Sequence, residues 1–219
     1  MTIYRWIEIS GIPQEPGIYA WYYSPEITDY DLDLAIKTIN ELKQNDQQDS
    51  ALKLIEHFLE KNIFKYFKEE PYQVFIEGSL KPNYEGYIEH KPSISKSLVS
   101  RILDEPERLE TVRNLVQSSA PNFASPIYIG MSDKLGKRLK QHKKLIEKYR
   151  SEIDFQGNVK KDLKNQDNID QSFAMEVCRR NILPTQLFVV INIIADNGKR
   201  YIDIENILNR IHYPLLGRN

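Results

Sequence analysis

Three segments of the chain carry the apolar patterns that are typical of β-strands. Residues 17–23 are rich in aromatic and strand-favouring side chains, follow two prolines and stop at a Ser-Pro pair. Residues 126–130 form a short apolar run bounded by turn residues, and residues 186–194 form a longer run that leads into an Asp-Asn-Gly turn. We expect the second segment to be a buried strand and the third to be a central strand.

Between the first two segments, apolar side chains recur at helical spacing. Two stripes, within residues 32–42 and 52–63, are separated by a polar break and predict a helical hairpin. Residues 72–89 predict two strands joined by a turn at 81–83. Residues 95–117 predict a further helix, with their proline in a first helical turn.

The chain after the strand at 126–130 predicts a long amphipathic helix. Ser132 or Asp133 can cap its N-terminus. His142 falls inside the apolar stripe of this helix and Arg138 falls at its edge, so the pair is either part of the core or a site for a phosphate group. Four residues form the apolar stripe itself: Leu135, Leu139, Ile146 and Tyr149.

The C-terminal part of the chain predicts two more helices. Residues 154–170 are polar and predict a loop, residues 170–180 predict a helix, and residues 202–211 predict the last helix. Glu205 lies at the border between the apolar face of the last helix and solvent, where a carboxylate often has no function. Four residues of that helix are expected to face inward: Ile204, Ile207, Leu208 and Ile211.

The composition is that of a folded globular protein, with 41% hydrophobic and 28% charged residues in a chain of 219. This length allows one domain, or a catalytic domain with one large insertion. No apolar run approaches the roughly 20 residues that span a bilayer, and the N-terminus lacks a secretory pattern. The single cysteine, Cys178, fits a reducing compartment. We therefore expect a soluble cytoplasmic protein, and the frequent Lys, Asn, Ile and Tyr suggest an AT-rich bacterial or phage genome.

The net charge of −1 hides an asymmetry between the two halves of the chain. Residues 1–126 hold 13 Lys and Arg against 20 Asp and Glu, a net charge of −7, whereas residues 127–219 hold 17 against 11, a net charge of +6. The predicted helix after the strand at 126–130 is either a solvated basic face or a surface that attracts nucleic acid. Its lysines have no acidic residue among them: Lys134, Lys137, Lys140, Lys143 and Lys144.

Several catalytic motifs are absent from the sequence. There is no HExxH or cysteine-rich zinc spacing, no GxxxxGK[ST] phosphate loop, no GxGxxG fingerprint and no GxSxG nucleophile turn. These absences disfavour zinc proteases, P-loop enzymes, Rossmann dehydrogenases and serine hydrolases.

A set of spaced residues resembles the motifs of the GIY-YIG nuclease superfamily. The set consists of Gly17-Ile18-Tyr19 after Pro16, Tyr128-Ile129-Gly130, Ser132, Leu135, Arg138, Leu139, His142, Glu205, Pro214 and Asn219. The resemblance covers residues 16–23 and 126–219. It implies an α+β fold with a small three-stranded, mainly antiparallel sheet flanked by helices.

The resemblance also implies a division of the chain. Residues 1–23 and 126–219 would form the catalytic domain, and residues 24–125 would be a mostly helical insertion between two neighbouring strands. Such an insertion is tolerable because the cost of loop closure grows slowly with loop length. The insertion could read bases, form a dimer or bind another protein. A restriction-type enzyme that cuts both strands would favour a homodimer.

Chemical roles for five residues follow from the resemblance. Glu205 would bind Mg²⁺ or Mn²⁺, and Arg138 would hold the scissile phosphate. Tyr19 would activate the attacking water, with Tyr128 positioning that water or sharing the task. His142 would accept the tyrosine proton or orient the phenol.

The resemblance therefore leads us to expect a metal-dependent endonuclease that acts on DNA, in a restriction, phage-defence or mobile-element role. Two alternatives stay open: a nucleic-acid-binding module on the same fold without catalysis, and a nuclease that cleaves RNA. Asn219 would support the site, although it lies farther beyond Pro214 than the family pattern has it.

Overall fold

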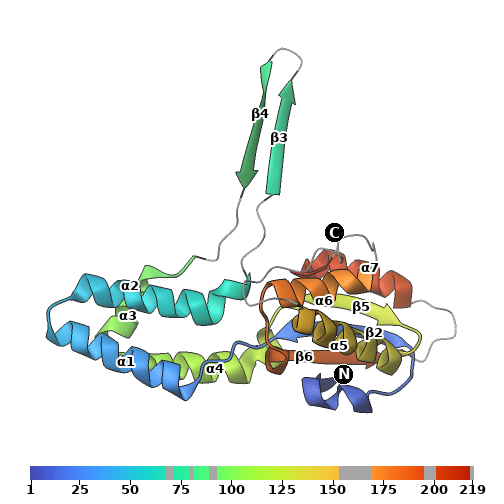
Figure 1. The fold of residues 1–219 in the computed structure, drawn as a ribbon, viewed down its shortest axis with the longest axis horizontal. Helices are drawn as coiled ribbons and strands as arrows, with labels where there is room; N and C mark the ends of the chain where they lie inside the picture. The colour runs from blue at the N-terminus through green and yellow to red at the C-terminus, as the bar shows by residue number, and fades with distance from the viewer. Residues whose placement is uncertain (68–71, 79–80, 89–92, 153–168, 195–200, 218–219) are drawn as a thin grey trace. The chain divides into compact units, whose positions relative to one another are not determined.

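A computed structural model shows the fold of the chain (Figure 1). It describes residues 1–67, 72–78, 81–88, 93–152, 169–194 and 201–217. The chain divides into two compact units, a first unit of Met1–Ser24 with Val116–Asn219 and a second unit of Pro25–Leu115. The expected boundaries, after residues 23 and 125, differ from these by one residue and by ten residues. The larger difference arises because one helix, α4 (Arg108–Phe123), runs through the second boundary.

The first unit is built on a four-stranded antiparallel sheet in the order β1-β6-β2-β5. The α+β class and the mainly antiparallel sheet are confirmed, but the expected number of three strands is wrong. The sequence does not predict β1, because its four residues are mostly exposed and show no apolar alternation. The four strands are β1 (Thr2–Arg5), β2 (Gly17–Tyr23), β5 (Tyr128–Ser132) and β6 (Leu187–Ile193).

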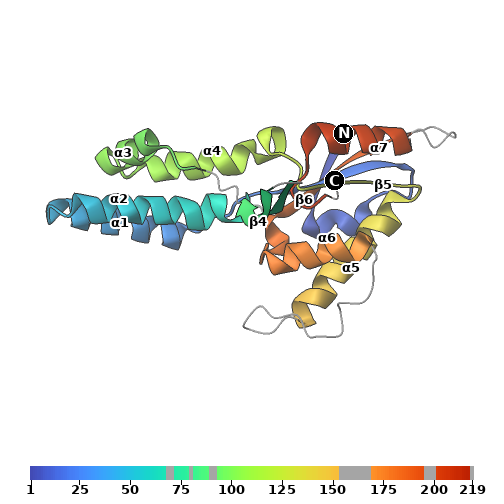
Figure 2. The ribbon, with the colours of Figure 1, turned by 90° about the horizontal axis from the view of Figure 1, so that it is seen from above.

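Helices cover both faces of this sheet (Figure 2). On one face lie α5 (Leu135–Glu152) and α6 (Ile169–Arg179), and on the other face lies α7 (Tyr201–His212). The predicted long helix after the strand at 126–130 and the predicted helix near 170–180 are therefore confirmed. The strand itself begins and ends two residues later than expected.

The alternating side chains of β2 fill the core on both faces of the sheet. Trp21 is fully buried, and its ring centroid lies 5.7 Å from that of Phe173 on α6. On the opposite face, Ile18 and Ile129 form a small apolar cluster that contacts Leu208 of α7. The two core layers thus meet at β2 and β5, the strands that carry the predicted tyrosines.

The inward face of α7 differs from the prediction. Leu208 packs against the sheet as expected, but Glu205 and Asn209 are the half-buried residues beside it. The prediction is wrong for the other three residues, which are 39%, 54% and 62% exposed: Ile204, Ile207 and Ile211. An apolar stripe in the sequence therefore does not mark the packed face of this helix.

The second unit contains the predicted helical hairpin, formed by α1 (Asp29–Gln44) and α2 (Gln48–Leu59). A π-helical turn (Glu60–Phe64) and a 3₁₀ turn (Lys65–Phe67) continue α2. The core of this unit is apolar, and six of its side chains are fully buried: Ile39, Ala51, Ile55, Leu59, Ile102 and Leu109.

The single helix predicted over 95–117 is wrong. The structure has α3 (Lys96–Asp104) and then a break before α4 begins at Arg108. Pro106 lies in the break, where it lacks an N–H group and disfavours helical geometry in the residue before it. Its carbonyl accepts a hydrogen bond from the Leu109 N–H at 3.0 Å, so Pro106 precedes the first turn of α4.

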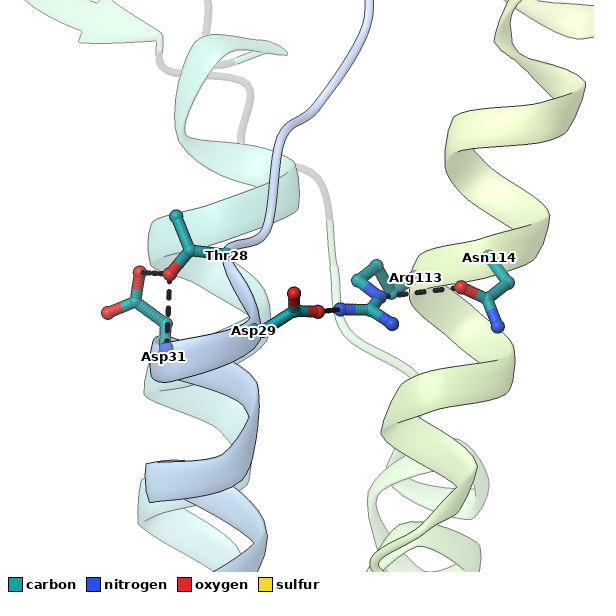
Figure 3. A network of polar contacts seen from close by, with 5 residues as sticks. All are labelled: Thr28, Asp29, Asp31, Arg113 and Asn114. Carbon is teal, nitrogen blue, oxygen red and sulfur yellow. Dashed lines mark hydrogen bonds and ion pairs between the residues drawn. The ribbon is translucent and has the colours of Figure 1, made fainter.

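The start of α1 is held by two polar contacts (Figure 3). Thr28 caps the helix, since its Oγ1 accepts a hydrogen bond from the Asp31 N–H at 3.1 Å. Asp29 forms an ion pair with Arg113 of α4, and Arg113 Nε donates to Asn114 Oδ1. These contacts connect the first helix of the second unit to its last.

Residues 72–88 form the predicted pair of strands, β3 (Tyr72–Gly78) and β4 (Lys81–Ile88). They make a two-stranded antiparallel sheet of their own. The turn predicted at 81–83 is wrong, because Lys81 is already the first residue of β4 and pairs with Gly78.

Some sequence predictions lie outside the described residues. The predicted loop at 154–170 does so for all but its last two residues, which open α6. The turn predicted at 196–198 and Asn219 lie entirely outside the described residues. Within the part that is described, no helix is long and apolar enough to cross a membrane.

Candidate active site

A buried contact joins β2 to α5 at the predicted site. The phenol oxygen of Tyr19 lies 2.9 Å from Nε2 of His142, and both side chains are almost fully buried, with exposures of 1% and 0%. Arg138, one turn before His142 on α5, donates from Nε to the same phenol oxygen at 3.3 Å. Three predicted residues that are far apart in the sequence are therefore in direct contact.

Gly130 makes room for Tyr19. The two residues are cross-strand partners on β5 and β2, so they lie on the same face of the sheet. A Cβ atom at position 130 would lie 2.6 Å from the phenol oxygen of Tyr19 and 2.7 Å from its Cζ. Because real side chains do not approach so closely, the Tyr19 ring can lie across β5 only where that strand has a glycine.

Tyr128 is the second tyrosine of the cluster. Its ring centroid lies 6.2 Å from that of Tyr19 and 5.7 Å from that of His142. It is only 6% exposed. Four of the five residues with predicted chemical roles thus form one cluster on the α5 side of the sheet, with Tyr19, Tyr128 and His142 buried and Arg138 half-buried.

Aromatic rings enclose His142. The rings of Trp21 and Phe173 lie 6.4 Å and 5.2 Å away, in addition to those of the two tyrosines. Burial, and to a smaller extent the positive charge of Arg138, lowers the pKa of His142 to about 3. The imidazole is therefore neutral near pH 7, and its Nδ1 has no hydrogen-bond partner among the described residues.

Phe173 is a part of the site that no pattern in the sequence indicates. It is fully buried on α6 and contacts His142, Trp21 and Tyr128 through its ring. The pattern around residue 173 indicates only a helix with a buried face. No motif or spacing connects it to the tyrosines, so only the fold could reveal this contact.

Glu205 reaches the site from the opposite face of the sheet, on α7. Burial raises the pKa of its carboxyl group above the ordinary value, while a hydrogen bond from Asn209 and the charge of Arg138 act in the other direction. The influence of Arg138 on both Glu205 and His142 puts this guanidinium in electrostatic reach of the two. The charge of Arg138 therefore acts on the carboxyl group of Glu205 as well as on the imidazole of His142.

Asn209 is the asparagine that the structure puts beside Glu205. Its Nδ2 donates to the Glu205 carbonyl oxygen at 3.1 Å and to Glu205 Oε1 at 3.4 Å. The spacing of four residues on one helix could have suggested this contact from the sequence. Asn219, the residue proposed from the family pattern, lies outside the described residues.

Four of the five predicted lysines line one hollow on α5. The hollow has a volume of about 590 Å³, and the described residues of its wall supply cations and amides but no carboxylate. Lys143 lies elsewhere: its Nζ is 5.3 Å from the centroid of the Trp6 ring and donates to the Trp6 carbonyl at 3.2 Å. The residues around the hollow are Gln14, Lys134, Lys137, Lys140, Gln141 and Lys144.

The chain before β2 holds the start of α5 in place. The N–H groups of Leu135 and Gly136 donate to the carbonyls of Glu15 and Pro13 at 3.0 Å and 2.9 Å. Gln14 accepts from the Lys137 N–H at 3.0 Å through its side chain. These bonds satisfy N–H groups that a helix N-terminus leaves open and so orient the helix that carries Arg138 and His142.

The N-cap position of α5 is Lys134 rather than the predicted Ser132 or Asp133, because the Lys134 carbonyl accepts the first intrahelical hydrogen bond, from the Arg138 N–H at 3.0 Å. Ser132 Oγ accepts a hydrogen bond from the Lys134 N–H at 3.0 Å. Ser132 ends β5, so this bond stabilises the tight passage from the strand into the helix.

The polar groups of the site fit only one kind of metal binding. Among the described residues, no three His, Cys, Asp or Glu side chains gather into a group that could hold an ion. A single half-buried carboxylate, Glu205, suits Mg²⁺, which usually keeps several waters and takes further oxygens from a phosphate. It does not suit a structural zinc site, which needs four protein ligands.

Comparisons of this chain with protein-family models, with curated proteins and with solved structures find no match. The resemblance to GIY-YIG nucleases therefore rests on the motif residues of the sequence alone.

Proposed function

We propose that the protein is a divalent-metal-dependent endonuclease of the GIY-YIG type that hydrolyses phosphodiester bonds in DNA. The observation that carries this proposal is the contact of Tyr19 with both His142 and Arg138, with Glu205 in electrostatic reach of Arg138. A phenol can orient an attacking water, a guanidinium can bind a phosphate, and a carboxylate can hold a hydrated cation. Restriction, phage defence or the life cycle of a mobile element would be the setting.

Arg138 would hold the scissile phosphate. A guanidinium has five N–H donors in a planar fork, so Arg138 can keep its bond to Tyr19 while it binds phosphate oxygens. Because Arg138 is half-buried, its charge is less screened than that of the lysines on the outer face of α5. It can therefore stabilise negative charge that develops in the transition state.

Tyr19 would orient and activate the attacking water. Of the two roles expected for His142, the geometry and the pKa favour orientation of the phenol. With its pKa lowered to about 3, the buried imidazole is a weak base and holds a phenol proton poorly. The neutral Nε2 of His142 can instead accept a hydrogen bond from Tyr19 and fix the direction of the phenol.

Glu205 would hold Mg²⁺ or Mn²⁺ with one carboxylate oxygen, while Asn209 donates to the other. The bound cation would act as a Lewis acid on the phosphate and its leaving oxygen. The lysines of the α5 hollow would attract the phosphate backbone beside the cleaved bond.

Cleavage assays test the proposal. Plasmid DNA, phage DNA and RNA of matched sequence are incubated with the wild-type protein and with Mg²⁺, Mn²⁺ or EDTA. We expect discrete DNA fragments that need the metal and that Glu205→Ala abolishes. Asp203→Ala is the matched control, because Asp203 is an exposed carboxylate on the same helix and should keep full activity.

Two results would contradict the proposal. If the wild-type protein cleaves no form of DNA under any condition, DNA hydrolysis is wrong. If Glu205→Ala and Asp203→Ala cleave equally well, the carboxylate has been assigned to the wrong residue. Cleavage of RNA alone would keep the site and change the substrate.

The burial of the two tyrosines favours a second candidate function, the binding of nucleic acid without cleavage. Tyr19 and Tyr128 are only 1% and 6% exposed, so water has little access to their phenol groups in this conformation. A module that binds nucleic acid through the α5 hollow without cleavage would need no such access. Salt-dependent binding of DNA without cleavage would support this alternative.

A further inference from the structure

The two-stranded sheet β3-β4 has one face without any charged or amide side chain. Three directly paired positions form this face, because paired residues of an antiparallel sheet lie on the same side. The pairs are Tyr72 with Ile88, Val74 with Gly86, and Ile76 with Tyr84. We call these six residues the apolar hairpin face.

Large side chains of the apolar hairpin face are open to solvent. Their exposed fractions lie between 57% and 62% for four residues: Tyr72, Ile76, Tyr84 and Ile88. A two-stranded sheet is marginally stable in water unless another element packs against it. Contiguous apolar surface of this kind usually marks an interaction site.

The other face of the hairpin is different in character. It carries Gln73 and Glu85, which are hydrogen-bonded to each other, together with Phe75 and Tyr87. Because this face is half polar, the apolar hairpin face is the more uniformly apolar of the two and the better candidate for a partner.

The centre of the apolar hairpin face is hollowed at Gly86. A Cβ atom built at this position would meet no atom within 4 Å. Val74 stands directly opposite on the neighbouring strand. The face therefore has a projecting side chain and an open notch side by side.

We propose that a second copy of this chain packs its own apolar hairpin face against this one. A two-fold axis parallel to the strands, between two stacked hairpins, sets β3 of one copy over β4 of the other. In that arrangement the Val74 side chain of each copy enters the Gly86 notch of its partner. The same operation sets Tyr72 over Ile88 and Ile76 over Tyr84, so the face is complementary to itself.

The charge of the hairpin supports a second copy over nucleic acid. The apolar hairpin face has no charged side chain, and the described residues of the two strands include Glu77 and Glu85 against Lys81. The face therefore offers a polyanion no positive charge to bind. A second, identical apolar face meets no unpaired charge.

The area of the face sets the strength of the association. The four exposed side chains offer on the order of 100 Å² each, so two faces would bury roughly 800 Å² in total, below the roughly 1,200–2,000 Å² of stable complexes. The dimer is therefore reversible and depends on concentration. It does not depend on the proposed nuclease activity, so either proposal can fail alone.

Analytical ultracentrifugation of the full chain over a wide concentration series tests this dimer. We expect the wild-type protein to pass from monomer to dimer as concentration rises. Ile76→Lys, which puts a charge into the interface, should weaken association at least about tenfold. Phe75→Lys is the matched control, since Phe75 is the neighbouring residue, is equally exposed at 62% and points to the other face; it should dimerise like the wild type.

The variant Gly86→Leu distinguishes a specific fit of Val74 into the notch from non-specific hydrophobic association. The free hairpin has room for this side chain, so the variant should fold as well as the wild type in circular dichroism. It adds apolar surface but fills the notch that Val74 must enter, and we expect weaker association. A wild-type protein that stays monomeric at every concentration would overturn the proposal. So would stronger association of Gly86→Leu, or equal effects of Ile76→Lys and Phe75→Lys.

Discussion

Tyr19 on β2 and His142 on α5 are 123 positions apart in the sequence, and their polar atoms lie 2.9 Å apart in the core of the first unit. The contact is possible because Gly130 leaves space for the Tyr19 ring and because the aromatic rings around His142 keep the imidazole neutral. A neutral buried histidine has consequences for stability as well as for chemistry.

The stability of the protein should fall as the pH drops from about 6.5 towards 3. In the unfolded chain His142 regains an ordinary pKa near 6.5 and takes up a proton, whereas in the folded protein its pKa is about 3 and it stays neutral. The unfolded state therefore binds more protons in this window, and the free energy of unfolding decreases by up to about 1.4 kcal/mol per pH unit from this residue. Chemical denaturation at a series of pH values measures the slope.

The variant His142→Gln isolates the contribution of this residue. It should unfold at lower denaturant concentration near pH 7, but with a shallower loss of stability below pH 6.5. His212→Gln is the control, because His212 is exposed at the end of α7 and its removal should leave the slope unchanged. An equal slope in the wild type and in His142→Gln would show that His142 is protonated in the folded state.

Gly130→Ala should displace Tyr19. The added Cβ would overlap the phenol oxygen and Cζ of the Tyr19 ring, so the ring or the strand must move. We expect a loss of roughly 1–3 kcal/mol in the free energy of unfolding, as in other overpacked cores. The tyrosine would also lose its bonds to His142 and Arg138, so cleavage activity should fall with it.

Gly11→Ala serves as the control for this substitution. A Cβ atom at residue 11 would meet nothing within 4 Å, and the stability should change little. If Gly130→Ala is as stable and as active as Gly11→Ala, then Tyr19 is not held where the structure has it.

Lys140 and Lys143 should behave differently in nucleic-acid binding, although both belong to the basic run of α5. Lys140 lines the hollow, whereas Lys143 contacts the ring and carbonyl of Trp6. We expect Lys140→Ala to weaken DNA binding and to reduce the slope of log affinity against log salt by about 1. Lys143→Ala should leave that slope unchanged and instead lower the free energy of unfolding by about 0.5–1 kcal/mol. Fluorescence anisotropy across a salt series, with thermal unfolding of both variants, separates the two effects.

The contrast between Lys140 and Lys143 shows how far the sequence could predict the site. Spacing within one helix predicts which side chains lie near each other, and so it predicts that Arg138 and His142 point to the same side. It cannot predict that Trp6 lies under Lys143, because that contact depends on a distant segment. The same limit applies to Phe173, whose position beside His142 follows from the packing of α6 against α5.

The outward isoleucines of α7 illustrate the same limit for the fold. Their spacing resembles that of a packed helix face, yet the helix turns Glu205 and Asn209 towards the sheet side. Apolar periodicity identified the helix but not its rotation. The strand β1 could not be predicted from apolar periodicity, because its four mostly exposed residues form a strand only through pairing with β6.

Glu205 should destabilise the metal-free protein at neutral pH. Burial raises its pKa above that of the unfolded chain, so the contribution of this group to stability is present at low pH and is lost as the pH rises through the folded-state value. Glu205→Gln removes the charge and should raise the thermal unfolding temperature at pH 7. Bound Mg²⁺ or Mn²⁺ should raise that temperature in the wild type and not in the variant.

Asn209→Ala tests whether the neighbouring amide positions this carboxylate. Without the bond from Nδ2 to Oε1, the carboxylate keeps its charge but is free to rotate. We expect the metal concentration needed for half-maximal thermal stabilisation to rise several-fold, while the effect at saturating metal is retained, because ligand-orienting partners tune affinity rather than supply it. Asn206→Ala, on the exposed side of the same helix, should titrate like the wild type. A metal response that is identical in all three proteins would show that Asn209 does not act through Glu205, and a wild type without any metal response would remove the cation from this site.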